Sequence, residues 1–376
     1  EMSAMNQILR VNGEDQDVTV QAGVTRMQLN SYIRETGLFF PVDPGADATI
    51  GGMTSTRASG TNSVRYGTMR ENVLNVRVVL ANGQVIKTGG RARKSAAGYD
   101  LTRLFVGAEG TLGVITEITL RLHGKPEATT VAICSFPSVR AAVSCSVSTI
   151  QYGVPVARIE LLDKLQIRAC NNYSSLNLPE APTLFFEFHG STVGVREQAE
   201  TVEGIAKGLG GKSFKWAEKT EERNHLWKAR HDALYAALAL KPGSRAWSTD
   251  ACVPVSRLAE CIENTRLDIE NSRATATIVG HVGDGNFHVI FLIDPKCPEE
   301  QNIARQINHR MILRVIEMEG TCSGEHGIGI GKKDYLDTEF GEALGIMHDL
   351  KHTLDPCNIM NPGKVLDSDY CNSQIS

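Results

Sequence analysis

Residues 41–67 read PVDPGADATIGGMTSTRASGTNSVRYG, and this glycine-rich stretch is the strongest guide to the fold. Its glycines alternate with Ser and Thr, so the backbone can approach a ligand closely and present N–H groups to phosphate oxygens. The glycines of this stretch are Gly45, Gly51, Gly52, Gly60 and Gly67. A loop of this length in a compact domain is usually functional, with an irregular surface loop as the alternative. No Gly-x-Gly-x-x-Gly occurs in the chain, so a Rossmann dinucleotide site has no support.

Around this loop, the pattern of apolar residues predicts two regions of different architecture. The first third reads as short strands and turns, with a helix over residues 26–35 that Thr25 caps and Gly37 ends. From residue 128 onward strands alternate with longer helices, which favours an α/β or α+β layer structure. The predicted strands are 17–21, 75–80, 84–88, 113–122, 130–136, 156–162, 184–189, 246–251, 274–280 and 287–293, and the predicted helices are 139–150, 196–209, 221–240, 256–271, 299–319 and 340–354. The boundary is predicted at 123–127, where Pro126 breaks the strand pattern.

The composition excludes several classes of protein. A chain of 376 residues with 41% apolar and 22% charged residues is typical of two or three globular units. Its formal charge of -4 comes without a dense basic block, so nucleic acid is not an expected partner. No run approaches the roughly 18 apolar residues of a transmembrane segment. The nine cysteines are scattered and form no Cys-x-x-Cys pair, which favours a reducing compartment without a disulfide framework.

The segment HVGDGNFH, residues 281–288, lies between two predicted strands. Because Asp284-Gly285 is a turn signal, we expect His281 and His288 to face each other across a hairpin mouth, with roughly 5 Å between their Cβ atoms. Two imidazoles so placed suit one metal ion, and Glu325 of GTCSGEHG could supply a third ligand. Ordinary packed histidines remain the alternative at this point.

Two further residues are candidates for chemistry. His326 follows Glu325 among four glycines, and an imidazole with its ordinary pKa near about 6.5 can act as a general base near neutrality. A surface histidine in a loop is an equal alternative. Arg230 lies in the predicted helix HLWKARHDALYAALAL, where it could hold a substrate carboxylate in a bidentate pair. Spacing alone favours a solvated helix face on which Arg230 pairs with acids such as Glu222.

Six motifs in a fixed order give the chain a family resemblance. They are PVDPGADATIGGM from residue 41, ASGTNSVRYGTMRENVLNVRVVLANG from 58, FVGAEGTLGVIT from 105, GHVGDGNFH from 280, GEHGIGIGK from 324 and NPGK from 361. Along essentially its whole length the chain resembles the FAD-linked 2-hydroxy acid dehydrogenases of the vanillyl-alcohol oxidase flavoprotein superfamily. Within that family it is most similar to the mitochondrial members that oxidise D-lactate.

The resemblance implies a site made of three groups of residues. A divalent metal, Zn or Mn, would be held by His281, His288 and Glu325. His326 would be the catalytic base and Arg230 the carboxylate anchor. FAD would contact Pro44, Gly45, Ile50, Gly51, Gly52, Thr56, Gly60, Gly110, Gly113, Ile115 and Asn361.

The resemblance also implies an α+β fold in three parts. These are an FAD-binding domain of the two-lobed type over residues 1–124, an α+β ferredoxin-like cap domain over 125–339, and a C-terminal helix and tail over 340–376 that returns to the flavin. The family has another glycine-rich FAD loop that would precede residue 1, and Glu1 stands ahead of Met2. We therefore expect an N-terminally truncated chain with an incomplete FAD domain that holds FAD weakly by itself.

The expected activity is oxidation of D-lactate and short D-2-hydroxy acids to 2-oxo acids, with electrons passed to an external acceptor such as cytochrome c in mitochondria. The strand SRAWSTDACVP offers Trp247, Ser248 and Thr249 where relatives that oxidise dicarboxylic hydroxy acids would have a lysine. An unpaired second carboxylate is costly to bury, so monocarboxylates are the expected substrates. The alternatives are oxidation of D-2-hydroxyglutarate or glycolate, or a truncated non-catalytic form that cannot hold FAD.

Overall fold

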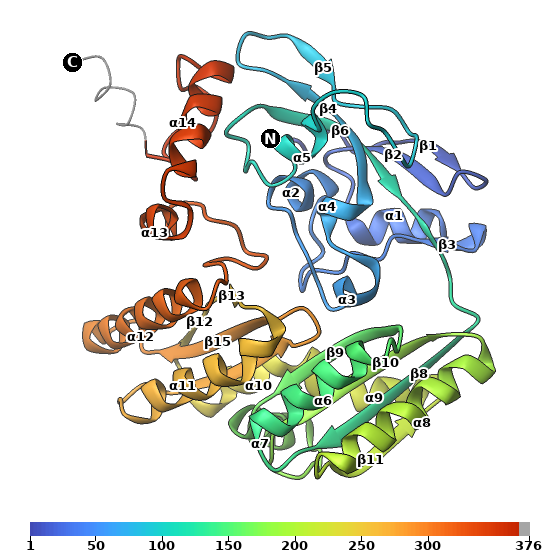
Figure 1. Cartoon of the computed structure of the whole chain (residues 1–376), viewed down its shortest axis with the longest axis vertical. Coiled ribbons are helices and arrows are strands. Elements are labelled where there is room, and N and C mark those ends of the chain that lie inside the picture. Colours follow the sequence, from blue (N-terminus) through green and yellow to red (C-terminus); the bar gives the residue numbers. More distant parts are fainter. Residues whose placement is uncertain (368–376) are drawn as a thin grey trace. The chain divides into compact units, whose positions relative to one another are not determined.

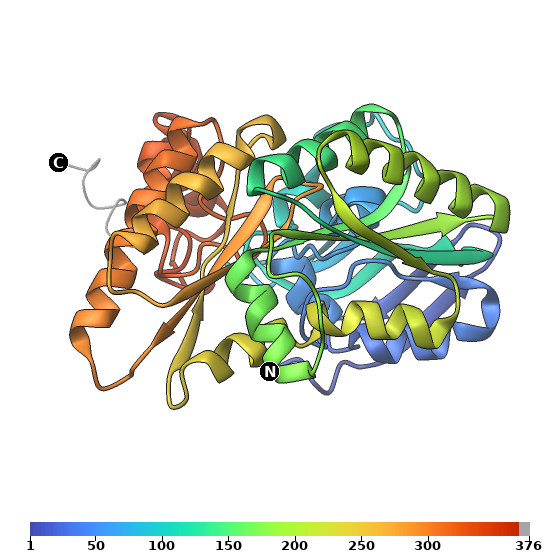
Figure 2. The ribbon, with the colours of Figure 1, turned by 90° about the horizontal axis from the view of Figure 1, so that it is seen from below.

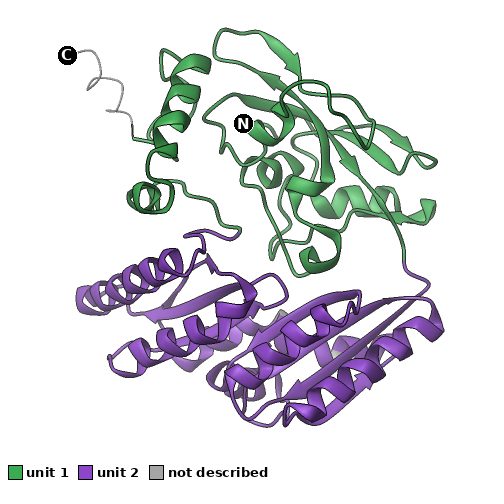
Figure 3. Ribbon diagram, viewed as in Figure 1, with its two compact units in different colours: residues 1–125, 325–376 green, residues 126–324 purple. Residues whose placement is uncertain are grey.

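The computed structural model describes residues 1–367, which form two compact units. Unit 1 comprises Glu1–Lys125 and the C-terminal part from Glu325, and unit 2 comprises Pro126–Gly324 (Figure 3). The junction at Lys125 lies within the region 123–127 where the sequence predicts a boundary. The predicted cap range 125–339 extends beyond unit 2, because residues 325–339 belong to unit 1.

Unit 1 is built on a five-stranded antiparallel sheet with the strand order β1-β2-β6-β4-β5 (Figure 1). The strands are β1 (Ile8–Asn12), β2 (Asp17–Gln21), β4 (Val73–Val79), β5 (Val85–Lys87) and β6 (Val114–Arg121), and β3 (Leu38–Phe39) pairs separately with β7 (His123–Gly124). Side chains alternate between the faces of each strand, which places Val18, Val20 and Ile118 in the core without exposure. The predicted Asn82-Gly83 turn joins β4 to β5, with a φ of 80° at Gly83.

The glycine-rich stretch 41–67 is helical in two places, at α2 (Ile50–Ser55) and α3 (Ser63–Tyr66). Thr49 begins α2, because its side chain accepts a hydrogen bond from the backbone N–H of Gly52. Gly51 is tolerated inside this helix for a packing reason: a Cβ there would lie 2.6 Å from the Cβ of Ala22, the residue directly after β2. Glycine at this position therefore allows α2 to approach β2 closely.

The remaining helices of unit 1 are short until the C-terminal part. They are α1 (Arg26–Tyr32), η1 (Arg34–Thr36), α4 (Met69–Asn72), α5 (Leu101–Phe105), η3 (Lys333–Tyr335), α13 (Leu336–Phe340) and α14 (Ala343–Leu354). Thr25 caps α1 through a capping box with Gln28, as the sequence predicts. The predicted helix 26–35 is divided, since α1 gives way to the 3₁₀ turn η1 before Gly37 adopts a left-handed conformation.

Unit 2 contains an eight-stranded sheet in which every pairing is antiparallel. The order is β11-β8-β10-β9-β14-β15-β12, with β13 also paired to β15. The strands are β8 (Ala128–Ser135), β9 (Val156–Leu162), β10 (Thr183–Gly190), β11 (Lys212–Ala217), β12 (Arg245–Ser248), β13 (Ala251–Cys252), β14 (Ala276–His281) and β15 (Asn286–Ile293).

Helices lie on both faces of this sheet (Figure 2). One layer holds α6 (Val139–Gln151), α8 (Thr192–Gly208), α11 (Leu258–Glu270), which follows η2 (Val255–Arg257), and α12 (Pro298–Glu317). The other holds α7 (Lys164–Ser174), α9 (Thr220–His231) and α10 (Ala233–Leu240). Under the second layer, Phe185 of β10, Trp227 of α9 and Ile167 of α7 share one apolar cluster. This second layer covers the face of the sheet that carries the site.

The sequence predicts one helix over 221–240, but the structure divides it at Asp232 into α9 and α10. The Asp232 carboxylate accepts hydrogen bonds from Ser174 and Lys228, which fixes the chain at the break. Likewise, the predicted strand 246–251 is two short strands, β12 and β13. Helix α7 and strand β11 are absent from the sequence prediction.

The eight cysteines within residues 1–367 are free thiols, five of them buried, and Cys371 lies outside the described residues. Among the helices that the structure describes, none combines the length and the apolar character needed to span a bilayer.

Candidate functional site

On the face that packs against α7, α9 and α10, the four central strands of unit 2 carry apolar side chains at one end and polar side chains at the other. Residues two apart in a strand share a face of the sheet. Strand β10 therefore presents Phe185 and then Glu187 to the second helix layer, which contains α9. Strand β15 presents His288 and then Ile290 to the same layer. The resulting group, which we call the polar end of the sheet, consists of Arg158, Glu160, Glu187, His189, His281 and His288. Glu160 is completely buried within it. Charged groups in such a setting require partners, and their partners define the site.

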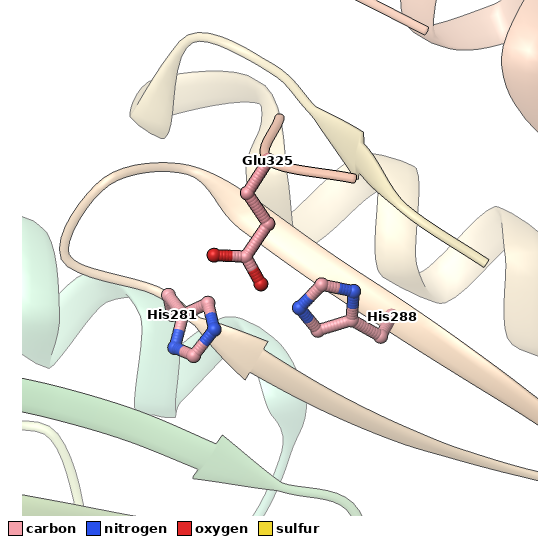
Figure 4. A group of neighbouring side chains, drawn as sticks. All are labelled: His281, His288 and Glu325. Atoms are coloured by element: carbon pink, nitrogen blue, oxygen red, sulfur yellow. The ribbon is translucent and has the colours of Figure 1, made fainter. Parts of the chain in front are cut away.

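Two histidines and a glutamate form a candidate metal centre (Figure 4). Each of His281, His288 and Glu325 offers one ligand atom, and these atoms lie within 4.8 Å of one another. Both histidines are buried. Glu325 directly follows Gly324, which is the last residue of unit 2. This spacing fits a single divalent cation, for which two imidazoles and a carboxylate are a common ligand set.

The two histidines do not face each other directly, so that detail of the sequence prediction is wrong. The loop 282–285 joins β14 to β15, and the register pairs His281 with Asn286 and His288 with Val279. His288 therefore lies two residues further along the same face. The imidazole centroids are nevertheless 5.3 Å apart, with the rings nearly perpendicular at 82°.

Hydrogen bonds select the tautomer of both imidazoles. Nδ1 of His288 donates to the backbone carbonyl of Thr249 at 2.9 Å. Nδ1 of His281 donates to Oε1 of Glu160 at 2.7 Å. In each of the two rings the other nitrogen, Nε2, therefore carries the lone pair. Nε2 is the atom that can bind a metal. The donor set of this chain therefore fits the ion that the cluster geometry suggests.

The segment before Glu325 is tied to the hairpin through Asp250. This buried carboxylate accepts hydrogen bonds from Nδ2 of Asn286 at 2.7 Å and from Oγ of Ser323 at 2.9 Å. A Cβ at Gly324 would lie only 2.1 Å from Nδ2 of Asn286. Because residue 324 is a glycine, the chain can pass close to the hairpin, and Glu325 can lie beside the two histidines.

Replacing Gly324 by Ala is expected to weaken Zn²⁺ binding by roughly 10-fold or more, because second-sphere displacements typically cost 10- to 100-fold in metal affinity. The new methyl group must displace Asn286, which Asp250 and the Ala251 carbonyl hold in place. Calorimetric titration of the metal-free protein measures the affinity. Gly331→Ala is the matched control, since a Cβ there would meet nothing within 4 Å. Unchanged affinity in Gly324→Ala would show that Asn286 moves freely.

Arg230 does not occupy a solvated helix face. Its Nε donates to Oε2 of Glu160 at 2.7 Å, and its side chain is 20% exposed. Glu222, the partner that spacing suggests, lies instead 4.0 Å from Lys219. Burial alone would raise the pKa of the Glu160 carboxyl, but His281 and Arg230 outweigh this effect and hold its pKa below the usual value. Glu160 is therefore an ionised group shared by a candidate metal ligand and the candidate carboxylate anchor.

His326 belongs to unit 1, where a carboxylate fixes the turn that carries it. Its Nε2 lies 3.9 Å from Oε1 of Glu325, and its side chain is 44% exposed. Glu109 accepts the backbone N–H groups of Ile328 and Gly329 at 2.7 and 2.8 Å. Glu109 was not among the residues predicted for the site, although it lies inside the GAEG motif. Its backbone has a positive φ of 51°.

The predicted FAD contacts divide by exposure. Buried are Ile50, Gly51, Gly60, Gly113 and Ile115; partly buried are Pro44, Thr56 and Gly110; exposed are Gly45, Gly52 and Asn361. Packing within unit 1 already accounts for all three buried glycines. Besides Gly51, which packs on Ala22, a Cβ at Gly60 would lie 2.5 Å from Asp43, and one at Gly113 would lie 2.5 Å from Val78. Glycine at these positions allows close packing inside unit 1.

The loops that contain Gly45 and Gly110 have accessible backbone, which a ligand can approach closely. A Cβ at Gly45 would meet nothing within 4 Å, and one at Gly110 would meet only Asn361, at 3.8 Å. Nδ2 of Asn361 donates to the backbone carbonyl of Glu109 at 2.5 Å, so the C-terminal segment returns to the GAEG motif. Open glycine backbone beside a side-chain amide is compatible with a flavin nucleotide.

Two protein-family models match the chain. The C-terminal domain of FAD-linked oxidases matches residues 125–365, and an FAD binding domain matches residues 1–89. The chain is 54% identical to a probable mitochondrial D-lactate dehydrogenase of Danio rerio, over 98% of this chain and 75% of the relative. It is 41% identical to a mitochondrial D-lactate dehydrogenase [cytochrome] 1 of Saccharomyces cerevisiae, over 97% of this chain and 63% of the relative. The chain thus spans only part of the length of both relatives.

Solved structures share the fold at low sequence identity. A p-cresol methylhydroxylase with substrate bound has a TM-score of 0.72 and 18% identity, covering 97% of this chain and 79% of that one. An alkyldihydroxyacetonephosphate synthase has a TM-score of 0.73 and 19% identity, covering 96% and 67%. These similarities support the predicted α+β architecture with a two-lobed FAD-binding fold.

Proposed function

The chain belongs to the family of FAD-linked oxidases, and from this premise we propose that it oxidises D-lactate, and short D-2-hydroxy acids, to the 2-oxo acid. The observation that carries the proposal is the joining of a His-His-Glu cluster to Arg230 through one buried carboxylate. The 54% identity to a probable D-lactate dehydrogenase supports it. The alternatives, oxidation of 2-hydroxyglutarate or glycolate, are less favoured, because the relatives at 41–54% identity carry D-lactate dehydrogenase names.

In this proposal each group of site residues has a separate role in the reaction. Arg230 holds the substrate carboxylate, because a guanidinium whose orientation is fixed by Glu160 suits a planar anion. His326 takes the hydroxyl proton. A divalent ion, Zn or Mn, on His281, His288 and Glu325 would polarise the hydroxyl as a Lewis acid when bound. FAD at the loops of unit 1 would supply the electron acceptor when bound.

We expect D-lactate to be preferred over D-2-hydroxyglutarate by on the order of 100-fold in kcat/KM, since an unpaired buried carboxylate costs about 2–3 kcal/mol. In β12, Trp247 packs on Phe291 with 5.8 Å between ring centroids, and Arg245 is exposed. Neither residue places a cation beside His288. Steady-state kinetics of the flavin-loaded protein with both acids test the preference. A higher kcat/KM for 2-hydroxyglutarate would contradict it, and Arg245→Ala would then reveal whether Arg245 binds the second carboxylate.

The names of the same relatives support a proposal for location and electron acceptor. The two relatives named above are called mitochondrial, and the yeast relative carries the word cytochrome in its name. We therefore propose that this protein acts in mitochondria and passes electrons to cytochrome c. Reduction of cytochrome c that depends on D-lactate, followed at the haem absorbance, would support this acceptor, and its absence with a working dye acceptor would exclude it.

A further inference from the structure

Glu160 occupies a distinctive place in the polar end of the sheet. It lies on β9 and is completely buried, and its two oxygens have separate partners. Oε1 accepts from Nδ1 of His281 and Oε2 accepts from Nε of Arg230, each at 2.7 Å. One rigid, planar carboxylate thus touches both a candidate metal ligand and the candidate carboxylate anchor.

A second carboxylate in the same sheet provides the comparison. Glu187, on β10, accepts from Nε2 of His189 at 2.8 Å and from Nη1 of Arg158 at 3.4 Å. Its surroundings resemble those of Glu160 in residue type and burial. His189, however, does not belong to the candidate metal centre that the described residues form. The two carboxylates therefore differ chiefly in what their histidines do.

We infer that Glu160 is a positioning residue that couples the metal centre to the substrate-carboxylate site. Through Oε1 it fixes the His281 tautomer that presents Nε2 to the ion, and through Oε2 it fixes the direction of the Arg230 guanidinium. Because a buried carboxylate needs both partners, a change at either partner reaches the other through it. This inference rests on the proposed roles of the cluster and of Arg230.

Glu160→Gln is the direct test, because the amide keeps the size of the side chain but can accept at only one of the two positions. Its NH₂ group would face either the Nδ1–H of His281 or the Nε–H of Arg230, which are both donors. We expect the Zn²⁺ affinity of the metal-free protein to fall by about 10- to 100-fold in calorimetric titrations. We also expect the KM for D-lactate to rise by roughly 10-fold or more, because Arg230 loses its fixed orientation.

Matched variants separate coupling from general damage to the sheet. Glu187→Gln removes an equivalent buried charge and should leave the Zn²⁺ affinity within about twofold of the wild type. Glu160→Asp keeps acceptors for both partners and should recover part of the affinity that Glu160→Gln loses. If Glu160→Gln does not fold, Arg230→Gln carries the test, since it must weaken Zn²⁺ binding although Arg230 is no ligand. Its control is Arg223→Gln on the same helix, whose arginine binds the Thr129 carbonyl.

The outcomes distinguish this inference from the proposed function. A wild-type protein that binds Zn²⁺ and oxidises D-lactate, with Glu160→Gln altered in both affinity and KM, supports the coupling. The same wild type with Glu160→Gln altered in only one property, or equal to Glu187→Gln, overturns the coupling and leaves the function standing. A wild type that neither binds Zn²⁺ nor oxidises D-lactate overturns both.

Discussion

Replacement of His288 by Ala is expected to abolish metal binding and to lower kcat/KM for D-lactate by about 1,000-fold or more, the equivalent of about 4 kcal/mol of transition-state stabilisation. The variant loses one of the three candidate ligands, and the Thr249 carbonyl that holds the imidazole cannot replace it. The side chain lies at the polar end of the sheet, so little apolar packing is lost and the fold should persist. Elemental analysis and steady-state kinetics of the flavin-loaded protein measure the two effects.

His189→Ala is the control for this prediction, because it removes a buried imidazole from the same sheet that is not one of the three cluster residues. It should retain the ion. Full metal content together with full turnover in His288→Ala would show that the three residues are not a metal centre. His281→Ala and Glu325→Ala should reproduce the loss, since each also removes a ligand atom.

Replacement of His326 by Ala should lower kcat for D-lactate by about 100- to 10,000-fold, the usual contribution of a positioned general base. The metal content should stay unchanged, because Glu325 rather than His326 belongs to the cluster. KM should change little, since Arg230, the proposed carboxylate anchor, is unchanged in this variant. Steady-state kinetics with metal analysis of the same sample separate this result from that of His288→Ala.

His352→Ala offers a comparison, since His352 lies in α14 of the same unit but outside the turn fixed by Glu109. It should leave kcat unchanged. If His326→Ala retained a normal kcat, the base would have to be another group, and the turn around Ile328 would have only a structural role.

Local signals made part of the site predictable. The Asp284-Gly285 turn brings two histidines of one hairpin together whatever the rest of the chain does, and the structure contains that hairpin. The capping of α1 by Thr25 is equally local. The exact register was not predictable, because it depends on how many residues the loop between the strands takes up.

The residues that support the site could not be predicted from spacing. Glu160 meets His281 across 121 positions, Asp250 meets Ser323 across 73, and Glu109 meets Gly329 across 220. No periodicity along the chain connects such partners, and only the tertiary fold brings them together. The same reason explains Arg230, for which the helix pattern suggested Glu222 and the sheet supplied Glu160.

The contact of Glu109 with Ile328 and Gly329 also has a consequence for the order of events during synthesis. Both partners belong to unit 1, yet all of unit 2, Pro126–Gly324, lies between them in the chain. A ribosome therefore completes unit 2 before the segment that carries His326 exists. Since domains generally fold as units while the chain emerges, the sheet with its two histidines can form first. The turn that carries His326 is then added last, to an N-terminal part of unit 1 that was synthesised before unit 2.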